Sequence, residues 1–312
     1  MIVTTPLGEI WAGFFDGTIP SMQLLINALI AGSLAALMAG GLALVYGVLG
    51  VFNLALGQLA LTGGLSTWWL HQAGLPLGVS ILGGVVAGAI ITWLTFEIAV
   101  APFYRRERTL PLVTTIAWSM ILDALILLVF QEEPKSILSG AKHFIEVGNI
   151  RVSVEQMVMI ALTLVFLALV AWVLHSTLFG RRLRATVQNA DAARSLGISS
   201  SLLHRIVFIG SGVLAALGGI YMGIDQNLTP TLAFPITIKA YAALIAGGKD
   251  NFWGTILAAY LIALLEQLAI GTPWWFGGYI SAGYQSVVAL LFIIVVLLIK
   301  PSGLFSKTMR AA

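Results

Sequence analysis

Cysteine is absent from this chain of 312 residues, and charged residues are scarce. Without cysteine there is no disulfide framework, no thiolate nucleophile and no cysteine-ligated metal site. Asp, Glu, Lys and Arg together make up 9% of the residues, whereas 59% are hydrophobic. A water-soluble domain of this size needs far more charged surface than that. We therefore predict an integral membrane protein.

Signatures of enzymes and of metal sites are missing as well. The four histidines show no His-Glu-x-x-His spacing, so a helical zinc site has no support. Gly247-Gly248-Lys249 resembles the end of a phosphate-binding loop, but Ala243 stands where that loop has glycine and Asp250 follows the lysine. An intramembrane serine protease at Gly210-Ser211-Gly212 would need a catalytic partner deep in the bilayer, and such small residues are typical of helix packing. We predict no catalytic residues, no metal and no cofactor.

Long hydrophobic runs fill the rest of the sequence. Because a helix needs about 20 apolar residues to cross the hydrocarbon core, they predict an all-α fold, a polytopic transmembrane helical bundle of about nine spans. The spans are expected near residues 22–46, 54–70, 79–100, 113–131, 155–175, 204–226, 235–248, 252–270 and 279–299. The segment 235–248 is short and begins at Pro235, so whether it crosses or re-enters stays open. No linker divides the chain, and residues 1–312 are expected to form a single transmembrane domain.

The basic residues indicate which ends of the spans face the cytoplasm. Twelve of them fall in segments assigned to one side, whereas Lys135, Lys142 and Arg151 fall on the other. This asymmetry is typical of a multi-pass protein of the bacterial inner membrane, with the N-terminus outside and the C-terminus inside. It also explains the excess of positive charge without nucleic-acid binding. The cytoplasmic set is Arg105, Arg106, Arg108, Arg181, Arg182, Arg184, Arg194, Arg205, Lys249, Lys300, Lys307 and Arg310.

The longest polar segment between predicted spans is the cytoplasmic loop 181–204. An apolar stripe runs through it every three or four residues from Leu183 to Leu196, which predicts a short amphipathic helix. Gly197 follows the stripe, where a residue without Cβ can adopt the left-handed conformation that ends a helix. We expect this helix and its turn to dock on a partner protein, although a cytosolic loop with chance alanines is the alternative.

Residues 43–58 interrupt two apolar runs with glycines, an asparagine and a glutamine. Such residues loosen a helix and free backbone groups, and broken helices of this kind often line the substrate path of transporters. We predict that the path is lined here by Tyr46, Asn53, Gly57 and Gln58. The alternative is that Asn53 and Gln58 only bridge packed helices.

Five charged residues lie within predicted spans: Glu97, Asp123, Asp225, Lys239 and Glu266. Charge in the bilayer is costly, so each is expected to be paired, neutral or beside water. We expect Asp225 and Lys239 to be partners. Asp123 is the one near mid-span, and a proton or sodium relay and a structural pair are both compatible with it.

Two motifs resemble those of the branched-chain amino acid permeases of bacterial ABC importers. Asp191-Ala192-Ala193 followed by Gly197 is similar to the acidic-Ala-Ala, three-residue, Gly loop of ABC importer permeases, and Tyr46-Gly47 with Asn53, Ala55 and Gly57 matches the Tyr-Gly, Asn-x-Ala-x-Gly signature. Leu56 and Gln58 depart from the residues usual beside the second motif. Further matches are Pro230, Lys239-Ala240-Tyr241, Gly247-Gly248 with Gly254, and the tail Lys300-Pro301-Ser302-Gly303-Leu304-Phe305.

The resemblance implies a permease subunit that is not itself an enzyme. It implies a second permease subunit, two cytoplasmic ATPase subunits that bind the loop through Asp191, Ala192, Ala193 and Gly197, and a periplasmic solute-binding protein. Branched-chain or related amino acids would be the solute, with urea, amides or another small organic solute as the alternative. An ion-coupled secondary transporter would use Asp123 and would need no docking helix.

Overall fold

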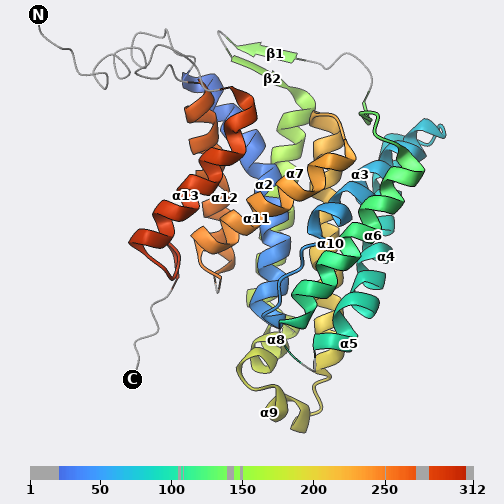
Figure 1. Cartoon of the computed structure of the whole chain (residues 1–312), viewed down its shortest axis with the longest axis vertical. Helices are drawn as coiled ribbons and strands as arrows, with labels where there is room; N and C mark the ends of the chain where they lie inside the picture. Colours follow the sequence, from blue (N-terminus) through green and yellow to red (C-terminus); the bar gives the residue numbers. More distant parts are fainter. Residues whose placement is uncertain are drawn as a thin grey trace, which may run out of the picture.

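The structure is a computed structural model that describes residues 21–104, 107, 109–138, 144–147, 150–249, 251–271 and 281–306. The predicted outer N-terminus lies outside these ranges, as do Lys307 and Arg310. Helices dominate, and Figure 1 shows them as one elongated bundle. The elements in chain order are α2 (Ser21–Leu49), α3 (Leu56–Gln72), α4 (Leu77–Thr95), a π-helical segment (Phe96–Val100), α5 (Ala101–Tyr104), α6 (Leu110–Phe130), β1 (Phe144–Val147), β2 (Ile150–Ser153), α7 (Val154–Ser176), α8 (Leu178–Gln188), α9 (Ala190–Ser195), α10 (Ser200–Asp225), a 3-10 turn (Pro230–Leu232), α11 (Ala233–Gly247), α12 (Phe252–Gly271), a second 3-10 turn (Ala282–Tyr284) and α13 (Gln285–Ile299).

Seven helical segments in the described part of the chain are long and apolar enough to cross a membrane. They correspond to predicted spans one and three to eight. The predicted second span is α3, which has 17 residues, and the ninth is α13, which has 15. At 1.5 Å per residue these two helices are about 25 and 22 Å long, shorter than a hydrocarbon core of about 30 Å. The nine-span count therefore stays a prediction, while the polytopic helical architecture is observed.

A small two-stranded sheet departs from the predicted all-α fold. β1 and β2 pair antiparallel, with Phe144 opposite Ser153 and Val147 opposite Ile150. Alternating β-branched and polar residues favour strands over a helix in this segment. The hairpin lies at one end of the bundle and α8–α9 lie at the other (Figure 1). The loop predicted to be outside and the loop predicted to be cytoplasmic are thus at opposite ends.

α2 and α10 form the centre of the bundle. α2 packs against α10, α11, α12 and α7, and α10 also packs against α3 and α4. The outer helices leave large apolar side chains exposed, among them Leu128 of α6 (79%), Val165 of α7 (61%) and Leu298 of α13 (79%). Exposed apolar side chains on this scale suit contact with lipid tails rather than water.

α3 and α10 approach each other closely because small residues line their contact. A Cβ on Gly219 of α10 would lie 1.8 Å from the carbonyl oxygen of Ala60, and a Cβ on Gly64 would lie 2.6 Å from that of Gly219. The obstacle in both cases is backbone, which has little freedom to move. Close backbone approach of this kind is how helices associate in lipid, where no hydrophobic effect drives them together.

We expect Gly219→Val to prevent α3 from docking on α10. Overpacking costs roughly 1–3 kcal/mol even where side chains can adjust, and here they face backbone. The purified variant should show a lower unfolding temperature and a lower yield of monodisperse protein. Gly210→Val on the same helix is the control, because a Cβ there meets no atom within 4 Å. Equal stability of the two variants would contradict the packing described.

Candidate translocation and coupling sites

The chain breaks between α2 and α3, where the sequence predicts a loosened helix. α2 ends at Leu49, Gly50 takes a positive φ of 67°, and α3 begins at Leu56. In Figure 1 the connection runs as a non-helical trace beside the bundle. Thr115 of α6 holds it: the Leu54 N–H donates to the Thr115 hydroxyl (3.3 Å), which lies 3.4 Å from the Phe52 carbonyl.

Asn53 is completely buried in this break. Its Oδ1 accepts a hydrogen bond from the Ala55 N–H (3.1 Å), which fixes the turn into α3. Its Nδ2 has no hydrogen-bond partner among the described residues. A polar side chain with one bonded end and one free end is oriented and still has a donor available.

Gln58 Oε1 is a second buried polar atom near the break without a partner in the described part of the chain, and the Tyr241 hydroxyl from α11 lies beside the Asn53 backbone. The Tyr241 ring from α11 packs against Phe52 with 5.5 Å between ring centroids. Gln58 Nε2 donates to both carboxylate oxygens of Asp123, each at 3.1 Å. An unsatisfied buried polar group costs about 1–3 kcal/mol, so the free atoms of Asn53 and Gln58 indicate a place where a ligand or water completes the bonding.

Gly57 and Tyr46 have different surroundings. The Gly57 N–H donates to the Thr237 hydroxyl (2.9 Å), and a Cβ there would lie 2.0 Å from the Ala233 carbonyl oxygen. Gly57 thus lets α3 pack against α11. Tyr46 lies at the end of α2, its ring 4.7 Å from Phe52 and 5.9 Å from Lys249 Nζ. The structure therefore groups Tyr46, Asn53 and Gln58 around the break and encloses Gly57 behind it.

The loop 181–204 lies within a segment that contains two helices, α8 and α9, where one was predicted. Asn189 interrupts the pattern, because its Oδ1 accepts hydrogen bonds from the N–H groups of Asp191 (3.1 Å) and Ala192 (3.0 Å) and so begins α9. Asparagine is a favoured N-cap residue, so Asn189 could have predicted the start of a second helix, but the apolar stripe continues across it and favours one helix. The prediction of a single amphipathic helix is wrong in this respect.

The apolar stripe also divides between two faces. Leu183 and Ala193 are buried, at 3% and 2% exposure, whereas Val187 (51%) and Leu196 (80%) are exposed. Asp191 is exposed as well and forms an ion pair with Arg194 at 3.5 Å. The surface that this loop offers to a partner therefore includes Leu196 and Asp191 but excludes Ala193.

Gly197 ends α9 as predicted. Its φ is 79°, its N–H donates to the Arg194 carbonyl (2.9 Å), and the Ile198 N–H donates to the Ala193 carbonyl (3.1 Å). These two hydrogen bonds, together with a left-handed glycine, form the Schellman motif that ends a helix. The prediction of a left-handed turn is confirmed.

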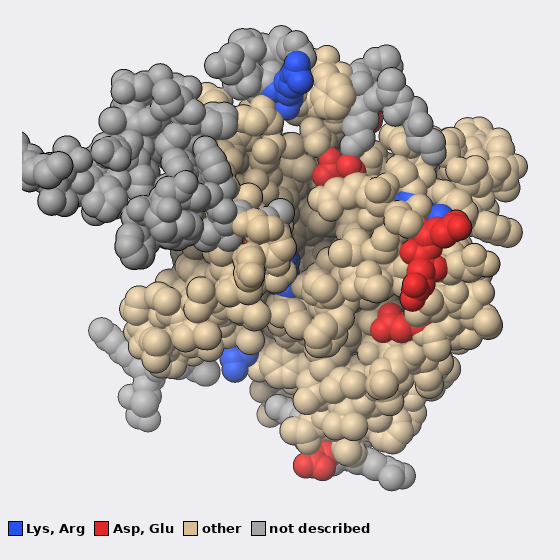
Figure 2. Space-filling view, turned by 45° about the horizontal axis from the view of Figure 1, so that its top comes forward, with Lys and Arg blue, Asp and Glu red and all other residues tan. Residues whose placement is uncertain are grey.

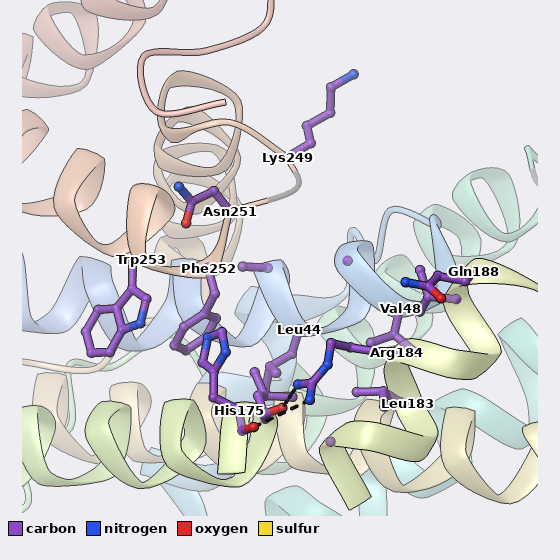
Figure 3. Close-up of a pocket in the computed structure, with 15 residues that line it drawn as sticks. Leu44, Val48, His175, Leu183, Arg184, Gln188, Lys249, Asn251, Phe252 and Trp253 are labelled. Atoms are coloured by element: carbon purple, nitrogen blue, oxygen red, sulfur yellow. Dashed lines mark hydrogen bonds between the residues drawn. The ribbon is translucent and has the colours of Figure 1, made fainter. Parts of the chain in front are cut away.

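A cavity of about 570 Å³ lies between α8 and parts of α2, α7 and the 249–253 segment. Figure 3 shows side chains from α2, α7, α8 and the 249–253 segment pointing toward it. Arg184 of α8 donates to the Leu174 and His175 carbonyls at the end of α7, which anchors α8 to the bundle.

The intramembrane charges pair differently from the prediction. Lys239 forms an ion pair with Glu266 at 3.0 Å, and Asp225 accepts a hydrogen bond from Gln156 Nε2 at 2.7 Å. The predicted pairing of Asp225 with Lys239 is wrong, because the packing of α11 on α12 brings Glu266 to Lys239. Glu97 in the π-helical segment pairs with Arg205 of α10 at 2.6 Å.

No role in the site was predicted from the sequence for Tyr241, Asn189 or Arg184. Asn189 carried a readable capping signal. Tyr241 lies far along the chain from Asn53, so only the packing of α11 beside the break brings them together.

Comparison with known proteins shows similarity along nearly the whole chain. The family described as "Branched-chain amino acid transport system / permease component" matches residues 24–297. The chain is 24% identical to the "High-affinity branched-chain amino acid transport system permease protein LivH" of Escherichia coli (strain K12) and 28% identical to the corresponding protein BraD of Pseudomonas aeruginosa, covering 92% of this chain and 96% of each relative. A solved structure, "PsaBC from Streptococcus pneumoniae in complex with Fab", shares the fold with a TM-score of 0.51 and 16% identity, over 95% of this chain and 97% of that one.

Proposed function

Because this chain belongs to the family of branched-chain amino acid transport permease components, we propose that it is the transmembrane permease subunit of an ABC importer. It moves branched-chain or related amino acids across the bacterial inner membrane by alternating access. ATP hydrolysis takes place on two separate cytoplasmic ATPase subunits. A second permease subunit, a copy or a sister chain, and a periplasmic solute-binding protein complete the complex. The family match over residues 24–297, which runs from α2 into α13, is the observation that carries this proposal.

The break at Asn53 to Gln58 is the proposed solute path. A zwitterionic amino acid needs groups that replace water at its carboxylate and its ammonium. The free Asn53 amide donor, the free Gln58 carbonyl and the Tyr241 hydroxyl provide both kinds of bond without a full charge. Uncharged partners hold the solute weakly enough to release it. Gly57 contributes by letting α11 approach, and Tyr46 borders the break on the cytoplasmic side.

The loop 181–204 is the proposed coupling element. Its docking surface consists of α9 and the turn after it, with Asp191, Ala192 and Leu196 exposed and Gly197 shaping the end. Ala193 is buried, so it contributes by packing α9 against the rest of the structure and not by touching the partner. Arg184 then connects the loop to α7.

Reconstituted uptake tests the function. The chain, purified with its partner permease, ATPases and binding protein, should accumulate radiolabelled leucine in vesicles only when ATP is present on the ATPase side. Urea and acetamide are the competing solutes, since a path of neutral amides suits them too; uptake of either in preference to leucine would favour the alternative substrate class. Uptake abolished by an ionophore and independent of ATP would instead indicate ion coupling through Asp123.

Cysteine labelling tests the orientation, and the absence of native cysteine makes it unambiguous. Glu133, with 75% of its side chain exposed, lies in the loop after α6, and Ser195 ends α9 at the opposite end of the bundle. We expect an impermeant thiol reagent added outside intact cells to label Glu133→Cys. Ser195→Cys should react only after the membrane is opened. Labelling of both from outside would contradict a cytoplasmic coupling loop.

A further inference from the structure

A second cavity lies inside the bundle, on the other side of α11 from the break. It has a volume of about 240 Å³, is partly open, and is lined mainly by α2, α10, α11, α12 and α13. Apolar side chains form most of its wall, including Met38, Met222 and Ile262. A cavity of this volume is many times the minimum that holds one water molecule, so it has room for a small solute.

Two opposite charges face this cavity. Lys239 Nζ lies 3.0 and 3.1 Å from the two carboxylate oxygens of Glu266, and Gln285 Nε2 donates to one of them (3.1 Å). The Glu266 side chain is 4% exposed, whereas that of Lys239 is 25% exposed, so the ammonium is the more accessible member. Gln226 and Ser286 are the other polar residues of the wall.

Packing alone does not account for an ion pair at this depth. Removing two charges from water is costly, and replacing a buried pair with apolar residues is often neutral or stabilising. An ionisable pair inside the membrane is therefore a candidate functional site by default. Here the pair borders an open cavity instead of being sealed by side chains.

The cavity is placed to receive solute from the end that carries β1–β2. Gln226 follows the last residue of α10 and Gln285 begins α13, and both helix ends lie toward that end of the bundle (Figure 1). Figure 2 shows this face with few charges and a hollow near its middle, in which a basic side chain is visible. A solute released onto this face would meet the polar rim first.

We propose that this cavity binds a zwitterionic α-amino acid with an aliphatic side chain. The α-carboxylate pairs with Lys239, the α-ammonium pairs with Glu266, and the aliphatic side chain lies against Met38 and Ile262. When a zwitterion separates Lys239 from Glu266, its carboxylate and its ammonium each give one of these residues a new partner. An ion of one sign would leave one of the two buried charges unpaired. The inference rests on the proposed function and names where the solute is recognised within the chain.

Equilibrium binding to the purified full-length chain in lipid nanodiscs tests this site. Radiolabelled leucine should bind saturably. Leucinamide lacks the carboxylate and 4-methylpentanoate lacks the ammonium, and each should compete at least about thirtyfold more weakly than leucine, because each leaves one charge of a buried pair unmatched. Equal competition by leucine and either analogue, or no saturable leucine binding, would overturn the proposal without need of any variant.

Variants locate the site. Lys239→Met should bind leucine and leucinamide equally well, and it should still bind 4-methylpentanoate more weakly than leucine. Glu266→Gln should bind leucine and 4-methylpentanoate equally well, and it should still bind leucinamide more weakly than leucine. A purely structural role of the pair would weaken all three ligands equally and would overturn the proposal. Arg205→Met is the matched control, since it breaks the Glu97 ion pair outside the cavity and should leave leucine binding unchanged.

Uptake by the complete complex separates this inference from the proposed function. Leucine uptake by a complex whose isolated chain shows no saturable leucine binding would reject the site and keep the importer. Leucine binding with the expected selectivity, in a chain that supports no ATP-driven uptake, would support the site and reject the importer.

Discussion

Gly197→Val is expected to abolish solute uptake while the protein still inserts and assembles. The left-handed φ of 79° disfavours a β-branched residue, so the turn that ends α9 must change conformation. Leu196, the 80% exposed side chain beside it, then leaves its docking position. Uptake should fall about a hundredfold, which corresponds to roughly 2.7 kcal/mol of lost coupling. Leu196→Asp should have the same effect by placing a charge on the docking surface.

The measurements are leucine uptake and stimulation of ATP hydrolysis by the binding protein, both in the reconstituted complex. Gly74→Val is the control, because Gly74 also has a positive φ (91°) and open space around it but follows α3 at the opposite end of the bundle. It should strain the backbone similarly and keep uptake coupled. Normal uptake in both Gly197→Val and Leu196→Asp would remove the coupling role of this loop and favour a secondary transporter.

Loss of the uncharged polar groups at the break is expected to have the second large effect. Tyr241→Phe is the smallest change, because it removes only the hydroxyl and keeps the ring that packs on Phe52. Asn53→Leu and Gln58→Leu remove the two free polar groups. Each should lower uptake about tenfold to a hundredfold, because a passing solute is left with an unpaired polar group that costs about 1–3 kcal/mol. Basal ATP hydrolysis should continue.

Tyr260→Phe serves as the control for the hydroxyl. Its oxygen lies 3.0 Å from the Ser33 hydroxyl, so its removal costs a hydrogen bond inside the bundle but changes nothing at the break. Thermal unfolding and uptake should be measured together. If Tyr241 had only a structural role, Tyr241→Phe would leave uptake unchanged, and that result would exclude Tyr241 from the path.

Much of the architecture could be read from local patterns. Apolar runs of about 20 residues identify membrane helices because the bilayer requires every backbone group to be bonded within the segment. Glycine after an apolar stripe predicted the turn at Gly197, because the left-handed conformation is a local property of the chain. The interruption between α2 and α3 could also be predicted, because the glycines, Asn53 and Gln58 interrupt the apolar runs locally. Asn189 was a local signal too, and its capping role divides the loop into α8 and α9.

Contacts between helices were decided by the tertiary structure alone. Lys239 lies beside Glu266 and not beside Asp225, Ala193 faces inward, and Tyr241 reaches the break from α11. Each depends on the rotation and tilt of one helix against another, which close packing of small residues sets. A sequence specifies which residues a helix carries, and hydrophobic helices in lipid have no polar face that reveals which side meets which neighbour. The membrane class, most of the helical segments and the turn at Gly197 follow from the sequence by itself, whereas the partners of the buried charges and the side chains that meet at the break follow from how the helices pack.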